Sequence, residues 1–123
     1  MSIQRLHSNT RMSQVVIHNG TIYLSGQVDL DDPAPTVGEQ AARVLSRIDE
    51  LLREAGSSKA FVLSATIWLA DIEFFGEMNG VWDQWLPVGC APARATVQAD
   101  LAFASLLVEV SVIAAVTQGN VRI

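Results

Sequence analysis

Two charged residues in the last third of the chain have types and spacing suited to chemistry on a small anion. Arg94 stands in the segment 93–99, and Glu109 stands fifteen residues later in the aliphatic run 106–116. A guanidinium presents a planar fork of donors that fits a carboxylate, and a desolvated carboxylate can hold and activate water. The pair therefore predicts an anion clamp beside a general base.

Both residues are expected on one face of a sheet, the face without helices. Alternation along an extended strand places Arg94 with Thr96 and Gln98, opposite four small apolar side chains. Glu109 shares that face if the two strands pair through the turn between them. Burial in an apolar run should raise the pKa of Glu109 unless Arg94 offsets it. A structural ion pair is the other interpretation, because a charge inside a strand is usually just paired.

Residue types elsewhere give weaker candidates. His7 and His18 have no second histidine, cysteine or acidic residue at metal-ligand spacing, so both are expected at the surface and no metal site is predicted. Cys90, the single cysteine, excludes an internal disulfide and is expected to be an inert small hydrophobe. Gly26, in Ser-Gly-Gln, either relieves strand strain or lets a ligand approach the backbone. Asn79 is, by its type alone, an ordinary surface residue.

The composition indicates one domain that associates with another copy. The 123 residues suffice for a single core, so one domain over residues 1–123 is predicted. Half of the residues are hydrophobic and 17% are charged, which is too apolar for disorder and low in charge for a monomer that must cover its whole surface. Part of the apolar surface is therefore expected to meet a second subunit.

Charge and hydropathy exclude several classes of partner. The net charge is −5 with no cluster of lysine or arginine, which argues against an electrostatic grip on nucleic acid or anionic lipid. The longest apolar stretch, 101–116, has 16 residues and carries Glu109, so no membrane span is expected. Residues 1–12 lack the apolar core of a signal peptide, and the single cysteine suits a reducing compartment. A cytoplasmic protein is predicted.

The elements that must position these residues follow the order strand, strand, helix, strand, helix, strand, strand. They span residues 14–17, 21–28, 36–55, 61–70, 71–86, 93–99 and 106–116. Asn19 and Gly20 supply the positive φ angles that a tight hairpin turn needs. Thr36 and Glu39 form a capping box, and Gly56 stands where a C-terminal cap belongs.

Two amphipathic helices can cover only one face of such a sheet, which gives an α+β domain of two layers. On the covered side the sequence predicts two sets of inward side chains: Phe61, Leu63, Ala65, Ile67 and Leu69 of the strand, and Phe75, Met78, Trp82 and Trp85 of the helix. Asp71 is the expected N-cap of that second helix. The other face carries Trp68, which predicts burial against another subunit.

These residues together resemble the RidA/YjgF family, also labelled endoribonuclease L-PSP. The motifs that carry the resemblance are Leu24-Ser25-Gly26-Gln27 after the hairpin, Asp71, Asn79, Pro92-Ala93-Arg94 and Val108-Glu109-Val110. The resemblance covers nearly the whole chain. Its most specific part is the Ala-Arg element at fixed spacing from the glutamate.

The resemblance implies a chorismate-mutase-like α+β fold with two helices on one face of a mixed sheet, assembled as a homotrimer with ligand sites in the clefts between subunits. It also implies hydrolysis of 2-imino acids, formed from enamines such as 2-aminoacrylate, to 2-keto acids and ammonia without a cofactor. By position, Arg94 would bind the substrate carboxylate and Glu109 would orient or activate water. Gly26 and Thr96 would line the pocket through backbone groups, and Asn79 matches a pocket position.

The sequence departs from the family pattern at substrate-binding positions. Met12 stands where RidA-like members carry a tyrosine, and Thr96 stands where they carry a cysteine. Both changes keep the anion clamp and the carboxylate but bear on substrate choice, including 2-aminoacrylate itself. A trimer that binds a small carboxylate metabolite without turnover is therefore a second hypothesis. An endoribonuclease is disfavoured by the net charge of −5 and by the lack of a catalytic histidine pair.

Overall fold

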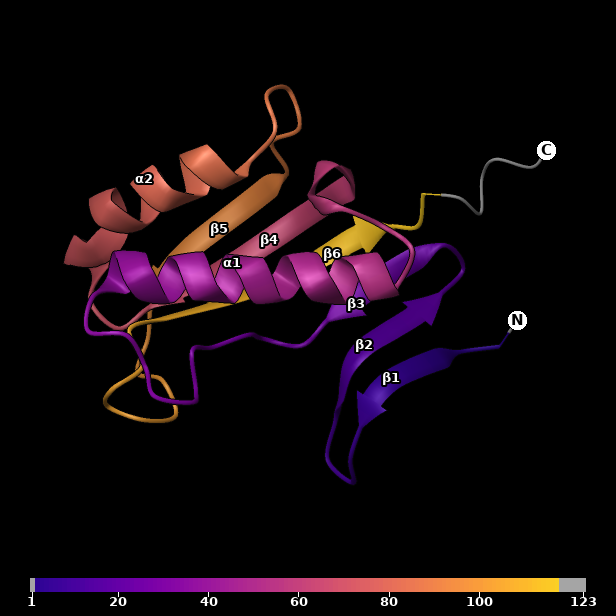
Figure 1. Cartoon of the computed structure of the whole chain (residues 1–123), viewed down its shortest axis with the longest axis horizontal. Coiled ribbons are helices and arrows are strands. Elements are labelled where there is room, and N and C mark those ends of the chain that lie inside the picture. The colour runs from indigo at the N-terminus through magenta and orange to yellow at the C-terminus, as the bar shows by residue number, and fades with distance from the viewer. Residues whose placement is uncertain (1, 118–123) are drawn as a thin grey trace.

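The computed structural model describes residues 2–117, which form a six-stranded mixed sheet with two α-helices on one of its faces (Figure 1). The strands are β1 Gln4–Ser8, β2 Ser13–His18, β3 Thr21–Leu24, β4 Val62–Leu69, β5 Ala93–Gln98 and β6 Val108–Ala115. The helices are α1 Val37–Glu54 and α2 Phe75–Trp85, and short 3₁₀ turns, η1 Lys59–Phe61 and η2 Ile72–Phe74, precede β4 and α2. The predicted arrangement of two helices on one face of a mixed sheet is confirmed. The predicted domain also includes residues 1 and 118–123, which lie outside the described part.

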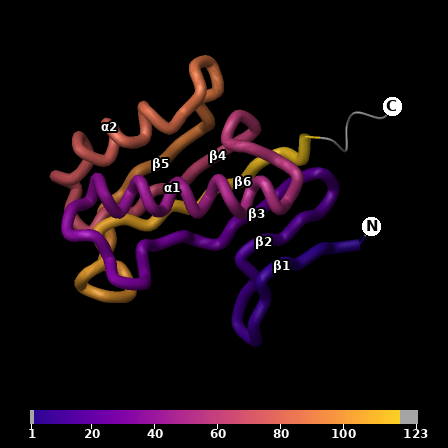
Figure 2. Tube along the Cα trace, in the orientation of Figure 1, coloured from indigo at the N-terminus to yellow at the C-terminus, as the bar shows by residue number. Residues whose placement is uncertain are grey.

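The strand order in the sheet is β1-β2-β3-β6-β4-β5. β4 and β5 run parallel, and every other neighbouring pair is antiparallel. The final strand, β6, therefore enters between β3 and β4 rather than beside β5, as the trace in Figure 2 shows. β5 is consequently an edge strand, and this placement decides which way Arg94 faces.

The N-terminal part of the sheet is a meander of three strands. The predicted hairpin joins β2 to β3, and Asn19 and Gly20 adopt positive φ angles of 53° and 77°. β1 pairs with β2 along the outer edge and is not among the predicted strands. Its five residues are nearly all exposed and show no regular alternation of apolar and polar side chains, so the usual signal of a strand is absent there.

Helix α1 begins and ends as its capping residues predict. Thr36 is the N-cap, and its Oγ1 accepts a hydrogen bond from the Glu39 N–H at 3.2 Å. The helix ends at Glu54, and Gly56 follows with a φ angle of 87°, a left-handed value that glycine adopts without strain. The apolar stripe of α1 packs onto the sheet and forms much of the core.

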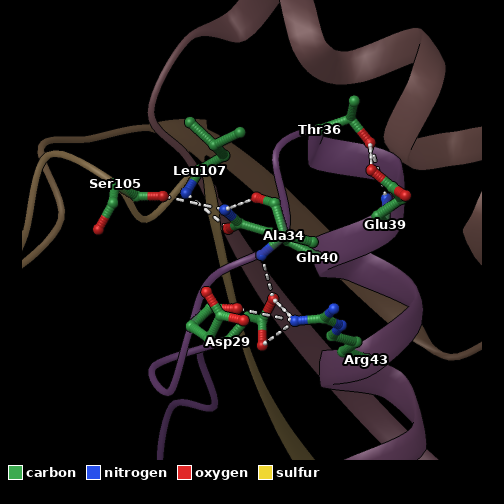
Figure 3. Close-up of polar contacts among 9 residues, drawn as sticks. Asp29, Ala34, Thr36, Glu39, Gln40, Arg43, Ser105 and Leu107 are labelled. Carbon is green, nitrogen blue, oxygen red and sulfur yellow. Dashed lines mark hydrogen bonds and ion pairs between the residues drawn. The ribbon is translucent and has the colours of Figure 1, made fainter.

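A buried glutamine ties α1 to two loops at one end of the sheet (Figure 3). Gln40 has no exposed surface, and its Nε2 donates to the carbonyls of Ala34 and Ser105, both at 2.9 Å. Its Oε1 accepts a hydrogen bond from the Leu107 N–H at 2.8 Å. These three bonds hold the loop that leads into β6 against the first turns of α1, just ahead of the strand that carries Glu109.

The predicted alternation in β4 holds only for its second half. The residues buried there as predicted are Ala65, Ile67 and Leu69. Upstream, Val62 is buried and Leu63 is 53% exposed, because the register against β6 shifts between Val62 and Ser64. The extra residue makes a β-bulge, which an alternation pattern does not reveal. Phe61 lies in the 3₁₀ turn ahead of the strand and is exposed, so the predicted burial of Phe61 and Leu63 is wrong.

The second helix starts later than predicted. Asp71 caps the 3₁₀ turn η2, where its carboxylate accepts a hydrogen bond from the Glu73 N–H at 2.9 Å, and α2 itself begins at Phe75. The buried side chains of α2 are Met78, Trp82 and Trp85, as predicted. Phe75 is 43% exposed, so its predicted burial is wrong. Its ring lies in the first turn of the helix, beside Arg94 of the edge strand.

The face of the sheet opposite the helices is uncovered in the single chain. Trp68 lies on this face, as predicted, together with Tyr23, Val97 and Ile113. Tyr23 and Val97 are exposed, and the other two side chains are half-buried. We refer to this surface as the bare face.

Replacing Gln40 with leucine should lower the free energy of unfolding by about 2–4 kcal/mol, because the new side chain has similar volume but leaves three backbone groups without their partners. Urea denaturation of the variant and the wild type measures the difference. Arg47→Gln on the exposed side of α1 is the control and should change the value by less than about 0.5 kcal/mol. A loss of under about 1 kcal/mol for Gln40→Leu would contradict this assignment.

Candidate functional site

Glu109 is the second residue of β6 and lies on the bare face. Its neighbours Val108 and Val110 are buried under the helices, and its partner across the ladder is Trp68 of β4. The side chain is half-buried, and within residues 2–117 no hydrogen bond or ion pair reaches its carboxylate. Burial therefore raises the pKa of the Glu109 carboxyl above its ordinary value. The rise predicted from the sequence is confirmed.

Gly26 leaves the space that the Glu109 carboxylate occupies. β3 ends at Leu24, four residues earlier than predicted, and the chain rejoins β6 at Gln27, which exchanges hydrogen bonds of 2.8 and 3.1 Å with Val110. A Cβ atom on Gly26 would collide with the carboxylate of Glu109. The φ angle of Gly26 is not in the left-handed region, so this position needs glycine for close approach and not for backbone freedom.

Met12 belongs to the same region of the sheet. It is the last residue of the turn between β1 and β2, and its side chain is exposed. The carbonyl of the next residue, Ser13, accepts a hydrogen bond from the Ser25 Oγ at 2.6 Å, one residue before Gly26. We call Met12, Gly26 and Glu109 the Glu109 half of the candidate site.

Arg94 faces the helices and not the bare face. In the parallel ladder it lies opposite Ala65, which is buried under the helices. The guanidinium carbon of Arg94 is 5.2 Å from the ring centre of Trp82 and 5.7 Å from that of Phe75, and both rings belong to α2. The prediction that Arg94 and Glu109 share a face of the sheet is therefore wrong.

The physical reason is the strand order. The prediction assumed that the strands of Arg94 and Glu109 pair with each other, whereas β4 lies between β5 and β6 and pairs with both. Alternation shows which residues share a face within one strand, but it does not show which face that is. No ion pair joins Arg94 and Glu109 in the described residues, so the structural ion pair is absent from the single chain as well.

Two buried polar atoms without partners lie on the same side as Arg94. Asn79 stands on α2 four residues after Phe75 and three before Trp82, so it projects from the same face of the helix. Thr96 is two residues after Arg94 and shares its face of β5. The Asn79 Oδ1 and the Thr96 Oγ1 are buried, and neither has a hydrogen-bond partner within residues 2–117. Buried polar atoms are rarely left so, which points to a water molecule, a ligand or a further chain at this place.

We call Asn79, Arg94 and Thr96 the Arg94 half. Two further residues, Phe75 and Gln98, shape the Arg94 half but are not among the predicted site residues. The Gln98 Oε1 accepts a hydrogen bond from the Ile72 N–H at 2.7 Å, which attaches the start of η2 to β5, and Phe75 contacts the guanidinium. The signal that could have found them is the polar row along β5, because three polar side chains on one strand face require partners.

The other candidate residues have no catalytic surroundings. The His7 Nε2 is 2.8 Å from the Glu54 Oε1 at an exposed position, and this hydrogen bond lowers the pKa of Glu54. His18 ends β2, and Cys90 is half-buried. Among residues 2–117, no three histidine, cysteine or acidic side chains are placed to hold a metal ion. Neither helix of this part of the chain has the length and apolar character needed to span a membrane.

A cavity of about 480 Å³ lies beside the Glu109 half but includes only Gly26 of the predicted site residues. Its other lining comes from Gln14, the segment 27–31, Arg43 and Arg47. Arg43 is engaged internally, since it pairs with the Asp29 carboxylate at 3.1 Å (Figure 3). The cavity therefore does not bring the predicted catalytic residues together.

Known proteins similar to this chain fall into one group. The family model described as Endoribonuclease L-PSP matches residues 2–116. The RutC family protein YoaB of Escherichia coli K12 is 45% identical over 117 residues, which cover 94% of this chain and 100% of that protein. The 2-iminobutanoate/2-iminopropanoate deaminase of Bos taurus is 38% identical over 91 residues, covering 70% of this chain and 66% of that protein. A crystal structure of a YjgF family member from Neisseria meningitidis has a TM-score of 0.90 at 45% identity and covers 94% of this chain and 95% of that one.

Glu109→Gln should stabilise the protein at neutral pH, because the ionised wild-type carboxylate is partly desolvated and the amide carries no charge. Since folding raises the pKa of this carboxyl, the wild type gains stability relative to the variant as the pH falls toward 4.5. Urea denaturation of both proteins at neutral pH and near pH 4.5 measures the gap, which should narrow at the lower pH. Glu73→Gln, which removes an exposed carboxylate, controls for net charge. An equal gap at both values would contradict the desolvation of Glu109.

Proposed function

Because the chain belongs to the endoribonuclease L-PSP (RutC/YjgF) family, we propose that it hydrolyses 2-imino acids such as 2-iminopropanoate to 2-keto acids and ammonia without a cofactor. The name of the bovine relative, 2-iminobutanoate/2-iminopropanoate deaminase, supports this reaction. The observation that carries the proposal is that the Arg94 half and the Glu109 half are chemically complementary, and that within residues 2–117 neither has a polar partner for its charged group. One holds a guanidinium beside two buried polar atoms, and the other holds a desolvated carboxylate.

The proposed active site lies between subunits of a homotrimer. The two halves lie on opposite faces of one sheet, and β4 separates their strands, so one chain does not present both to one substrate. In a ring of identical subunits, the β5 edge of one copy can meet the bare face of the next, and the contact repeats until the ring closes. The exposed Tyr23 and the half-buried Trp68 supply apolar surface for that contact.

The geometry of the two halves suggests how the reaction would run. Arg94 binds the substrate carboxylate through its planar fork, and the polar atoms of Asn79 and Thr96 gain hydrogen bonds from the substrate or from water. Glu109 of the neighbouring copy takes a proton from water while the water oxygen bonds to the imine carbon. Glu109 then returns the proton to nitrogen, which gives a carbinolamine. Glu109 next takes the proton of the new hydroxyl group and passes it to the same nitrogen, the carbon–nitrogen bond breaks as the keto group forms, and ammonia and the keto acid leave. No electrons are transferred to or from the protein.

The second candidate is a trimer that binds a small carboxylate metabolite without turnover. Met12 and Thr96, which replace the tyrosine and cysteine of RidA-like members, favour it. Both candidates use Arg94 in the same way and differ only in whether Glu109 acts on water. A nucleic acid substrate is not proposed, because the chain has a net charge of −5 and no cluster of basic residues. The cytoplasmic location stays a prediction.

Arg94→Ala and Glu109→Gln should each lower turnover by about 10²-fold or more, because each removes one half of the site. Turnover is measured as keto acid formed from an imino acid that an amino-acid oxidase generates in situ, after subtraction of the spontaneous rate. If the two variants are unfolded together and refolded in equal amounts, about a quarter of the sites combine an intact Arg94 with an intact Glu109 from the next copy. Activity should therefore return to about a quarter of the wild-type value.

Light scattering controls for assembly, since the variants and their mixture should each give about three times 13.3 kDa. A mixed trimer without recovered activity would show that Arg94 and Glu109 do not act across a subunit boundary. A monomer mass for the wild type would remove the shared site altogether. Wild-type protein that binds 2-keto acids but never exceeds the spontaneous rate would favour the second candidate.

A further inference from the structure

The aromatic contacts of Arg94 have a role beyond packing. We propose that Phe75 is a positioning residue, which holds the Arg94 guanidinium in the orientation that receives the substrate carboxylate. The proposal rests on the proposed function of Arg94 as the carboxylate binder. It adds a specific cause for the direction in which that side chain points.

The guanidinium of Arg94 lies close to two rings of the same helix. Its carbon is 5.7 Å from the ring centre of Phe75 and 5.2 Å from that of Trp82. Phe75 and Trp82 stand seven residues apart, two turns along α2, and Asn79 projects from the same face between them. The cation therefore contacts the face of α2 that also carries the buried Asn79 Oδ1, which has no partner within residues 2–117.

No polar contact within the described residues fixes this side chain. No carboxylate pairs with Arg94, and no hydrogen bond to its guanidinium is formed within residues 2–117. Contacts with ring faces attract the cation without using its N–H donors. All five N–H donors of the guanidinium therefore stay free for a bidentate ligand. A salt bridge would have occupied some of these donors.

The two rings differ in what else they do. Trp82 is buried and packs against Trp85 at 5.3 Å between ring centres, so it belongs to the core whether or not Arg94 is present. Phe75 is 43% exposed, which a core role does not explain. The 3₁₀ turn η2, which leads directly into Phe75, is also attached to the strand of Arg94, because the Gln98 Oε1 accepts a hydrogen bond from the Ile72 N–H at 2.7 Å. The segment that carries Phe75 is therefore anchored to the strand that carries the guanidinium.

Phe75→Leu tests the proposal through the binding of pyruvate to the assembled protein, measured by calorimetric titration. Loss of one cation–π contact should raise the Kd by about two- to fivefold. Phe75→Tyr keeps the aromatic ring and should therefore bind pyruvate with the wild-type Kd. Phe103→Leu removes another exposed phenylalanine, in the loop between β5 and β6, and should leave the Kd unchanged. Phe75→Met, which also lacks a ring, replaces Phe75→Leu if the leucine variant melts early.

A second readout does not depend on any ligand. The Arg94 Nε–H resonance should show a ring-current shift in the wild type and in Phe75→Tyr, and this shift should shrink in Phe75→Leu. These results together support a positioning role.

The Arg94→Ala and Phe75→Leu variants distinguish a failure of the Phe75 proposal from a failure of the proposed function of Arg94. If Arg94→Ala abolishes pyruvate binding but Phe75→Leu binds as the wild type does, the proposal for Phe75 is overturned and the role of Arg94 stands. If Arg94→Ala binds pyruvate as tightly as the wild type, the proposed function of Arg94 fails, and with it the positioning role of Phe75. An Arg94 Nε–H resonance that is the same in the wild type and in Phe75→Leu also overturns the proposal.

Discussion

The register of β4 fixes where both halves of the candidate site lie. On one side β4 pairs with β6, and Trp68 lies opposite Glu109. Because side chains alternate, this register places the carboxylate on the bare face and its valine neighbours in the core, and a slip of one residue would bury the carboxylate under the helices. On the other side β4 pairs with β5, and Ala65 lies opposite Arg94, which turns the guanidinium toward α2. A single strand thus directs the two charged groups to opposite faces.

The sequence predicts well those features that depend on neighbouring residues. The hairpin at Asn19 and Gly20 and the cap at Thr36 are decided within a few positions, and both are confirmed. The direction of Arg94 depends instead on strand order and on parallel pairing, which are set by the packing of elements far apart in the chain. The bulge at Leu63 arises in the same way, from the register between two strands. The candidate site residues could therefore be named from the sequence, but their division into two halves could not.

The charge of the protein constrains how an anionic ligand would be recognised. The chain has 13 acidic and 8 basic residues, so its overall field repels a carboxylate, although salt screens that field beyond about 8–10 Å. Arg43 is paired with a carboxylate at 3.1 Å, whereas Arg94 has aromatic neighbours and no acidic partner among the described residues. Under the proposed function, selection of an anion would therefore come from short-range contacts at Arg94 rather than from steering over a distance.

β6 is the last of the described strands to leave the ribosome, yet it occupies a place between β3 and β4. Until it arrives, the nascent chain can hold only two separate sheet fragments, the β1-β2-β3 meander and the β4-β5 pair. Each fragment would present an open edge of unpaired backbone groups that can join another chain. The hydrogen bond from the Ser111 hydroxyl to the Leu24 carbonyl spans 87 residues, which shows how late this closure comes. Completion of the sheet thus waits for the last described strand, and chains in which β6 has not yet taken its place are the most prone to aggregate.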